Sequence, residues 1–140
     1  MPTFEDALAL AAQAHKGQYD LAGAPYICHP MRVALAQSDE RARIVAILHD
    51  VIEDTAITYE GLSAAGFDDE IIGAVEALTK RSGEKRIDAA VRAKANPLAL
   101  PVKLADVADN MNLARISNPT AEDYARLREY EGVLAYLKEM

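Results

Sequence analysis

Two histidines and two aspartates in this 140-residue chain are the groups best suited to hold a metal ion. His49 and Asp50 are adjacent and follow the apolar run Ala46-Ile47-Leu48. His29 lies upstream and Asp106 downstream, each in an apolar helical context of its own. Two imidazoles and two carboxylates can bind one divalent cation and leave coordination positions open for water and a substrate. The four residues together therefore predict a metal centre.

Each of these residues also has an ordinary structural explanation. His29 could be a buried histidine bonded to backbone, or a helix-start residue made rigid by Pro30. Asp106 could form a salt bridge with Lys103, three residues earlier. Adjacent residues on a helix point about 100° apart, so His49 and Asp50 can reach one ion only from a favourable position. The occurrence of all four groups in one chain favours the metal centre.

Glu53 and Asp54 follow Asp50 at spacings of three and four residues, so all three acids can lie on one helix face. Repulsion between neighbouring carboxylates raises the pKa of one of them toward a range useful for acid–base catalysis, and a cation would offset that repulsion. The alternative is a solvated acidic helix end. We interpret Glu53 and Asp54 as a catalytic pair, and the sequence leaves open which is the acid and which the base.

The composition limits the classes of partner. Hydrophobic residues make up 51% of the chain, enough for a core, and the net charge of −7 argues against a broad nucleic-acid or membrane surface. A small anionic ligand remains compatible with this charge because a bound cation reverses the local field. The single cysteine, Cys28, and the lack of a basic, apolar leader predict a cytoplasmic protein. The oligomeric state stays open.

The apolar residues recur at helical spacing almost throughout, so we expect an all-α fold. Thr3 with Asp6, and Thr120 with Asp123, are typical of capping boxes at helix starts. The expected helices cover about residues 3–16, 25–37, 39–52, 58–65, 68–78, 87–95, 99–116 and 120–138. We therefore predict one domain, residues 1–140, built as a compact bundle of seven or eight helices.

Five sequence blocks occur in an order that resembles a known family. They are Ala-His-Lys-Gly-Gln (14–18), Gly-Ala-Pro-Tyr-Ile-Cys-His-Pro (23–30), Leu-His-Asp-Val-Ile-Glu-Asp-Thr (48–55), Leu-Thr-Lys (78–80) and Lys-Leu-Ala-Asp-x-x-x-Asn-Met (103–111). The set is similar to the HD-domain metal-dependent phosphohydrolases, and most of all to RelA/SpoT-type hydrolase domains and small alarmone hydrolases. The resemblance extends from about residue 4 to residue 137.

The resemblance implies roles for individual residues. The metal ligands would be His29, His49, Asp50 and Asp106, and the ion is usually manganese. Glu53 and Asp54 match the pair beside the attacked phosphate, and Asn110 matches an asparagine that contacts the nucleotide. The family reaction removes the 3′-pyrophosphate from guanosine tetra- or pentaphosphate. Carboxylate and imidazole donors suit Mn²⁺, with Fe²⁺, Co²⁺ and Mg²⁺ as alternatives.

The residues expected to read the substrate are less regular. Lys16, Lys80 and Lys103 are candidate phosphate contacts, although each could be a plain surface charge, and Gln18 borders a loop that could line a pocket. His15, beside that loop, is expected to be structural or to support the site.

Two segments depart from the family pattern. After Gln18 the alarmone hydrolases usually carry an arginine–lysine pair, but this chain has Tyr19-Asp20-Leu21. After Asp106 they usually carry Arg/Lys-Leu-His/Tyr-Asn, but this chain has Val107-Ala108-Asp109-Asn110.

From the candidate metal centre and the resemblance together, we predict a phosphohydrolase acting on a phosphorylated nucleotide, (p)ppGpp among the candidates. The alternatives are a non-catalytic metal- and nucleotide-binding sensor or partner module, and a purely structural helical protein.

Overall fold

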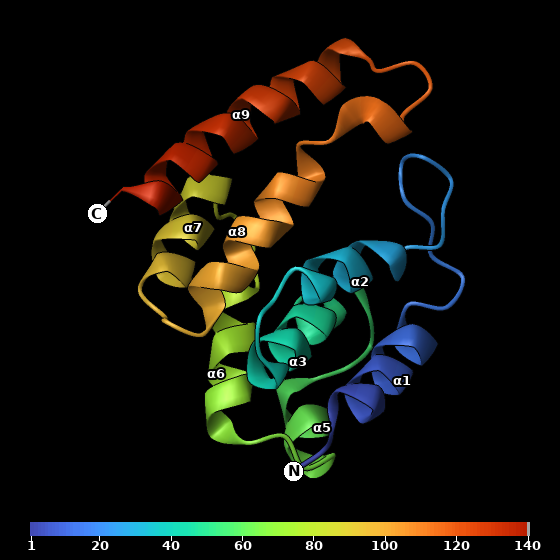
Figure 1. The fold of residues 1–140 in the computed structure, drawn as a ribbon, viewed down its shortest axis with the longest axis vertical. Coiled ribbons are helices and arrows are strands. Elements are labelled where there is room, and N and C mark those ends of the chain that lie inside the picture. The colour runs from blue at the N-terminus through green and yellow to red at the C-terminus, as the bar shows by residue number, and fades with distance from the viewer. Residues whose placement is uncertain (140) are drawn as a thin grey trace.

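Helices account for almost all regular structure in the computed structural model, which describes residues 1–139 (Figure 1). The elements are α1 (Phe4–Ala14), α2 (Cys28–Leu35), α3 (Glu40–Leu48), α4 (Val51–Asp54), α5 (Tyr59–Ala64), α6 (Asp69–Leu78), α7 (Arg86–Lys94), α8 (Ala99–Asn110), the 3₁₀ turn η1 (Leu113–Arg115) and α9 (Ala121–Lys138). Eight of the helices have at least six residues, and α4 is one turn of four. The prediction of an all-α bundle is confirmed.

The predicted helix starts at both ends of the chain are also confirmed. The Thr3 hydroxyl accepts a hydrogen bond from the backbone N–H of Asp6, whose carboxylate accepts one from the Thr3 N–H in return. Thr120 and Asp123 form the same reciprocal pair at the start of α9. Such caps satisfy N–H groups that have no partner inside the helix.

The predicted helix over residues 39–52 is wrong in one respect, because the chain turns at His49 and Asp50. Helix α3 ends at Leu48, and Asp50 precedes α4 with φ −107° and ψ −2°. These angles depart from the regular α-helical values of about −63° and −42°, so the two adjacent side chains need not diverge as they would on a continuous helix. The predicted helix over 99–116 also ends early, at Asn110, and Asn112 caps η1 instead.

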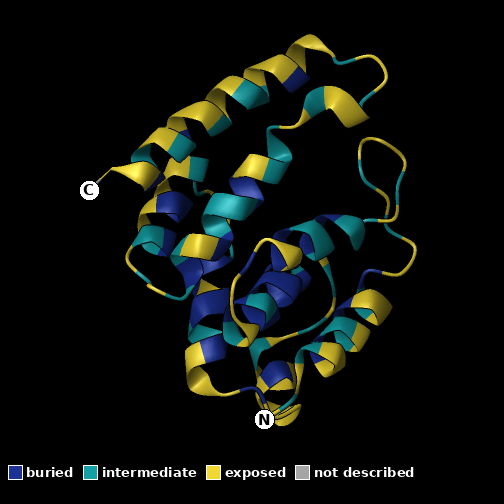
Figure 2. Ribbon diagram, viewed as in Figure 1, coloured by how far each residue is buried: buried dark blue, intermediate teal, exposed yellow. Residues whose placement is uncertain are grey.

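Helix α3 is the centre of the larger core. Residues 44–48 are fully buried, and α3 packs against α1, α2, α6 and α8 (Figure 2). A smaller core joins α7, α8 and α9 through Ala90, Val107, Val133 and Leu137. Helix α8 contributes to both cores and therefore fixes the position of its polar residues relative to α2 and α3.

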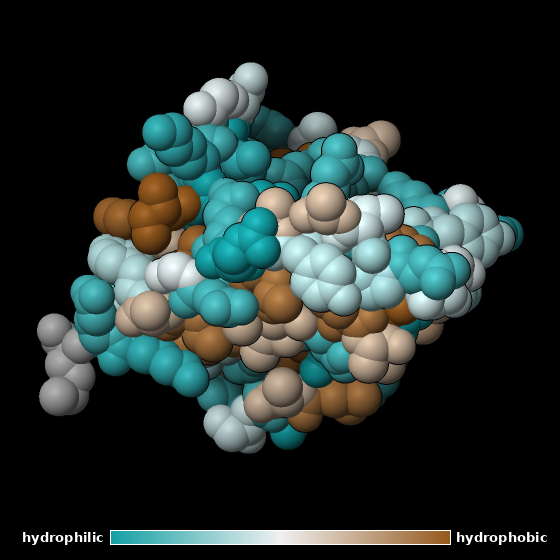
Figure 3. All heavy atoms as spheres, turned by 90° about the horizontal axis from the view of Figure 1, so that it is seen from above, coloured by the Kyte–Doolittle hydropathy of each residue, from teal (hydrophilic) through white to brown (hydrophobic). Residues whose placement is uncertain are grey.

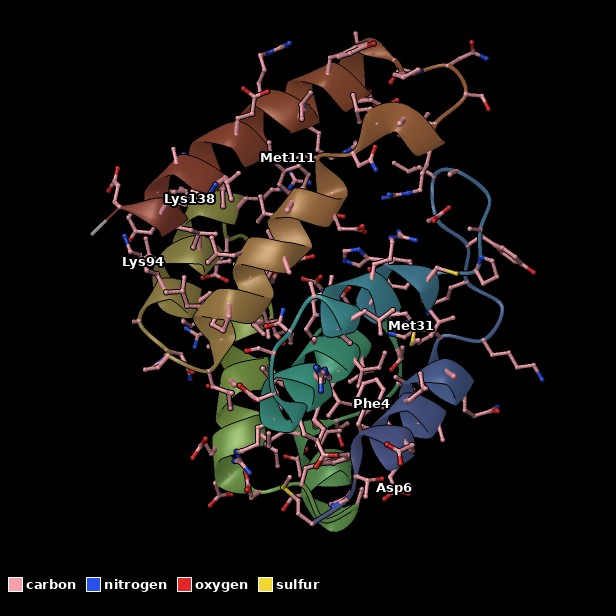
Figure 4. The ribbon with its side chains drawn as sticks, viewed as in Figure 1. Phe4, Asp6, Met31, Lys94, Met111 and Lys138 are labelled. Atoms are coloured by element: carbon pink, nitrogen blue, oxygen red, sulfur yellow. The ribbon has the colours of Figure 1, made fainter. Side chains whose placement is uncertain are left out.

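Helix α9 is tied to the rest of the bundle by α7 and α8. The Lys94 ammonium donates to the Tyr136 carbonyl at 2.8 Å, near the end of α9, and Met111 packs against the smaller core (Figure 4). The face seen from above in Figure 3 mixes hydrophilic and hydrophobic side chains. Within residues 1–139, the helices are all too short or too polar to cross a membrane.

An ion pair holds the loop between α6 and α7. Glu84 accepts hydrogen bonds from the Arg92 guanidinium at 2.6 and 2.9 Å and from the Arg81 backbone N–H at 2.6 Å. The guanidinium also donates to the Thr79 carbonyl at 2.7 Å. The hydrogen bond to the Thr79 carbonyl therefore fixes the backbone directly before Lys80.

We expect Glu84→Gln to lower thermal stability at neutral pH but to have a smaller effect in acid. Hydrogen bonds from Arg92 and from the Arg81 backbone lower the pKa of Glu84 from 4.5 to about 2. A depressed pKa stabilises the folded state above the unfolded pKa, and this contribution is lost as pH falls toward the folded pKa. The Tm difference from the wild type should therefore shrink below about pH 4.5. Glu76→Gln, in an exposed acid 3.9 Å from Arg81, is the control. A constant Tm difference would contradict this explanation.

Candidate metal centre and active site

Four side chains from three segments of the chain converge where α2, α3 and α8 meet. His29 Nε2 lies 2.9 Å from Asp106 Oδ1 and 3.8 Å from Asp50 Oδ2. His49 Nε2 lies 3.1 Å from Asp50 Oδ2 and 3.3 Å from Asp106 Oδ1. His29, His49 and Asp106 are buried, and Asp50 is half-buried. The structure thus brings together all four residues that the sequence suggested as metal ligands.

The environment of His49 fits a cation. Its Nδ1 lies 2.5 Å from the Ala46 carbonyl oxygen, which can only accept, so Nδ1 carries a proton. Its Nε2 is buried and has no aligned hydrogen-bond partner among residues 1–139, although two carboxylate oxygens lie near it. A nitrogen lone pair facing two carboxylates is unfavourable unless a positive charge lies between them. Two histidines and two aspartates are donors that divalent metals accept, so the residues fit such an ion.

The electrostatics of the cluster point the same way. Burial lowers the pKa of His49, but the charges of Asp50 and Asp106 outweigh burial and raise that pKa well above its usual value. Burial raises the pKa of Asp106, but His49 and a hydrogen bond from His29 bring it well below its usual value. The carboxylates are therefore held ionised and require a positive partner. Metal binding can replace the imidazole protons in that role.

Glu53 and Asp54 lie on α4, beside this cluster. Carboxylate oxygens of Asp50, Glu53 and Asp54 can come within 4.8 Å of one another. Glu53 and Asp54 are both exposed, but partial loss of hydration and the charge of Asp54 raise the pKa of Glu53, while partial loss of hydration and the charge of Asp50 raise the pKa of Asp54. An upward shift is the direction that general acid–base catalysis by a carboxyl group uses. Both acids therefore lie next to Asp50, and their role as an acid–base pair stays a prediction.

A cavity of about 390 Å³ opens over the cluster. Leu78, Ala89 and Tyr130 line part of it, and the rest of the lining is polar. The polar residues lie in or just before α2, α4, α7 and α8 and in the α6–α7 loop: Tyr26, His29, Asp50, Glu53, Asp54, Lys80, Arg86, Lys103, Asp106 and Asn110. His49 lies beneath this surface and is 2% exposed. Cations and carboxylates thus face the same space, as an enzyme for a phosphorylated substrate requires.

The predicted substrate-binding residues divide into two groups. Lys80, Lys103 and Asn110 line the cavity; Lys103 Nζ lies 3.4 Å from Asp106 Oδ2, and Asn110 donates to Asp106 Oδ1 at 3.2 Å. Lys16 is exposed just beyond α1 and does not line the cavity.

Gln18 also lies outside the cavity lining, but it contacts the backbone of one of the acids. Its amide donates to the Asp54 carbonyl at 2.8 Å and accepts from His15 Nδ1 at 2.9 Å. His15 is buried, so the expectation that it supports the site fits this chain of contacts. Gln18 and His15 therefore hold the end of α4.

Sequence reasoning did not identify Tyr26 or Asp109 as parts of the site. The Tyr26 hydroxyl donates to Asp50 Oδ2 at 2.6 Å, and burial and the Asp50 charge raise its pKa, so it remains a donor. Asp109 Oδ2 lies 2.7 Å from His29 Nδ1. Tyr26 lies in one of the sequence blocks that resemble the family, and this position could have marked it as a site residue. Asp109 was noticed only as a departure from the family pattern.

A second cavity, of about 290 Å³, adjoins the first and shares Tyr26, His29, Asn110 and Tyr130 with it. It includes the Tyr19-Asp20-Leu21 segment, the part of the chain that departs from the family pattern. Asp20 Oδ1 accepts from the backbone N–H groups of Ala22 and Ala24, both at 2.9 Å. This carboxylate therefore shapes its own loop as well as lining the cavity.

Comparisons with known proteins agree with this geometry. A family profile described as HD domain matches residues 7–100, which include His29, His49 and Asp50. The guanosine-3′,5′-bis(diphosphate) 3′-pyrophosphohydrolase MESH1 of Drosophila melanogaster is 30% identical, over 91% of this chain and 78% of its own length. The guanosine-3′,5′-bis(diphosphate) 3′-pyrophosphohydrolase of Haemophilus influenzae is 36% identical, over 89% of this chain and 22% of its own length.

The structural comparison gives the same result. A solved structure, described as a metazoan ortholog of SpoT that hydrolyzes ppGpp, has a TM-score of 0.82 and 26% identity, covering 96% of this chain and 85% of that one. The chain spans only 12% to 22% of the length of the long bacterial relatives. By its profile, its sequence relatives and its fold, the chain belongs to the HD-domain family.

Proposed function

We propose that this chain hydrolyses guanosine 3′,5′-bis(diphosphate), ppGpp, to release its 3′-pyrophosphate, and that residues 1–140 act as one hydrolase domain. The observation that carries the proposal is one cavity lined by three of the four cluster residues (His29, Asp50 and Asp106), by the acids Glu53 and Asp54, and by the cations Lys80 and Lys103. The relatives from Haemophilus influenzae and Drosophila melanogaster, both named as 3′-pyrophosphohydrolases of this nucleotide, match 89% and 91% of this chain, which supports the choice of substrate.

We assign His29, His49, Asp50 and Asp106 as the ligands of one divalent metal ion, with Mn²⁺ as the preferred ion. The buried Nε2 of His49 and the mixed imidazole–carboxylate donor set support this assignment. When bound, such an ion would polarise a phosphoryl oxygen and lower the pKa of water. Tyr26 would keep Asp50 in place through its 2.6 Å hydrogen bond.

The remaining residues of the cavity would bind the substrate and move protons. Glu53 and Asp54 would accept a proton from the attacking water and donate one to the ribose 3′-oxygen, whose bond to phosphorus breaks, because both have raised pKa values and lie beside Asp50. Lys80 and Lys103 would contact phosphate oxygens, and Asn110 would contact the nucleotide. The adjoining cavity, with the aromatic ring of Tyr19, would accept the nucleoside part.

We expect Mn²⁺-loaded protein to release pyrophosphate from ppGpp in a screen that also contains other phosphorylated nucleotides. Chromatography that separates phosphate from pyrophosphate measures the products, and EDTA-treated protein is the control. Turnover of another nucleotide with ppGpp untouched would reject the substrate and keep the hydrolase. Nucleotide binding without turnover under any divalent metal would instead support the non-catalytic sensor.

A further inference from the structure

Asp109 contacts a proposed metal ligand and two arginines, and the proposed function gives it no role. Its Oδ2 lies 2.7 Å from Nδ1 of His29. Arg32 donates from Nε to Oδ1 at 2.7 Å and from Nη2 to Oδ2 at 3.1 Å. Arg115 donates to the Asp109 carbonyl at 3.2 Å. Asp109 is therefore held firmly behind the His29 ring, on the side away from the cluster.

The contact determines which nitrogen of His29 can face the cluster. A carboxylate without a proton only accepts hydrogen bonds, so Nδ1 must carry the proton that lies between His29 and Asp109. Both oxygens of Asp109 accept hydrogen bonds from the Arg32 guanidinium, which favours the ionised carboxylate. Nε2 then faces Asp106 and Asp50, at 2.9 and 3.8 Å.

We propose that Asp109 is a positioning residue for the metal centre, which fixes the His29 ring with Nε2 toward the cation and is itself held by Arg32. A carboxylate behind a ligating histidine sets the tautomer and ring orientation and increases the basicity of the ligand. Position 109 is an aspartate in this chain, whereas the family that the sequence resembles usually has histidine or tyrosine there. The inference rests on the proposed function only in its assignment of His29 as a ligand.

The first experiment measures Mn²⁺ affinity by calorimetry, with no nucleotide present. Loss of such a supporting contact typically weakens metal binding by about 10-fold to 100-fold, and we expect this loss for Asp109→Ala. Asp109→Asn should also bind Mn²⁺ more weakly, because one amide oxygen cannot serve both His29 and Arg32. Asp68→Asn is the matched control, since Asp68 pairs with Arg41 and caps α6, where asparagine also serves as a cap.

The second experiment observes the His29 ring directly. The chain has three histidines, which makes their imidazole resonances assignable by NMR in protein loaded with diamagnetic Zn²⁺. We expect an Nδ1–H proton of His29 that is protected from exchange in the wild type and in Asp68→Asn. In Asp109→Ala this proton should exchange rapidly with solvent. A purely structural role for Asp109 would not change this signal in a folded variant.

The outcomes separate this inference from the proposed function. Affinity within twofold of the wild type for Asp109→Asn, with the His29 proton still protected, would overturn the inference; this isosteric variant decides if Asp109→Ala does not fold. If wild-type protein hydrolyses no nucleotide while both Asp109 variants lose Mn²⁺ affinity, the positioning role stands and the proposed function fails. If ppGpp is hydrolysed and Mn²⁺ affinity is unchanged by either variant, only the inference fails.

Discussion

Asp50→Asn should lower kcat/KM for ppGpp by at least about 10³-fold, since a catalytic metal contributes several kcal/mol and each 1.36 kcal/mol is tenfold in rate. The substitution preserves the shape of the side chain and removes one of two carboxylate charges from the cluster. Asp50 Oδ2 lies near both imidazoles, at 3.1 Å from His49 Nε2 and 3.8 Å from His29 Nε2. The amide leaves those nitrogens with a weaker, neutral partner, so metal affinity should fall together with turnover.

The measurements are the bound metal per protein after dialysis and the rate of pyrophosphate release. His49→Ala should give the same result, but it also leaves a hole beneath the cavity because His49 is only 2% exposed. Asp39→Asn is the matched control: Asp39 caps the start of α3, at the opposite end of that helix from His49, and asparagine caps equally well. Full turnover by metal-loaded Asp50→Asn would reject the assignment of Asp50 as a ligand.

Helical periodicity and capping residues predicted most of the fold because both are local properties. Thr3 and Thr120 start helices through contacts within three residues, which sequence displays directly. The break at His49 and Asp50 was missed because the surrounding apolar run favours an unbroken helix. This break depends on tertiary structure: it lets both adjacent side chains point toward His29 and Asp106, which belong to other helices.

The composition of the candidate site was predictable where residue type carries the chemistry. His29, His49, Asp50 and Asp106 were expected together, and the structure places them within contact of one another. Lys16 was proposed because a lysine beside a loop could reach phosphate, but the end of α1 leaves it outside the cavity.

Support from other parts of the chain could not be read from the sequence. Asp109 lies 80 positions from His29, and only the packing of α2 on α8 brings them together. Gln18 similarly acts at a distance, by donating to the carbonyl of Asp54, 36 positions away. Its side chain was predicted to face the substrate, whereas its contact with α4 supports one of the acids.

Glu53→Gln and Asp54→Asn should each lower kcat by about 10² to 10⁴-fold, the usual contribution of a general acid or base. Within residues 1–139, no hydrogen bond or ion pair joins either residue to His29 or His49, so Mn²⁺ affinity should stay close to that of the wild type. This split distinguishes the pair from Asp50, for which turnover and affinity should fall together. Glu60→Gln, in an exposed acid of α5, is the control for Glu53→Gln, and Asp39→Asn is the control for Asp54→Asn.

The pH–rate profile then separates the two roles. A variant that lacks the general base should lose the acid limb of the profile, and a variant that lacks the general acid should lose the alkaline limb. Asp54 is the better candidate for the base because Gln18 holds its backbone at 2.8 Å, which limits the movement of α4 beside the cluster. Gln18→Ala should therefore resemble a mild Asp54→Asn, with a lower kcat and an unchanged KM. An equal loss of both limbs in either acid variant would show that Glu53 and Asp54 titrate as one coupled unit.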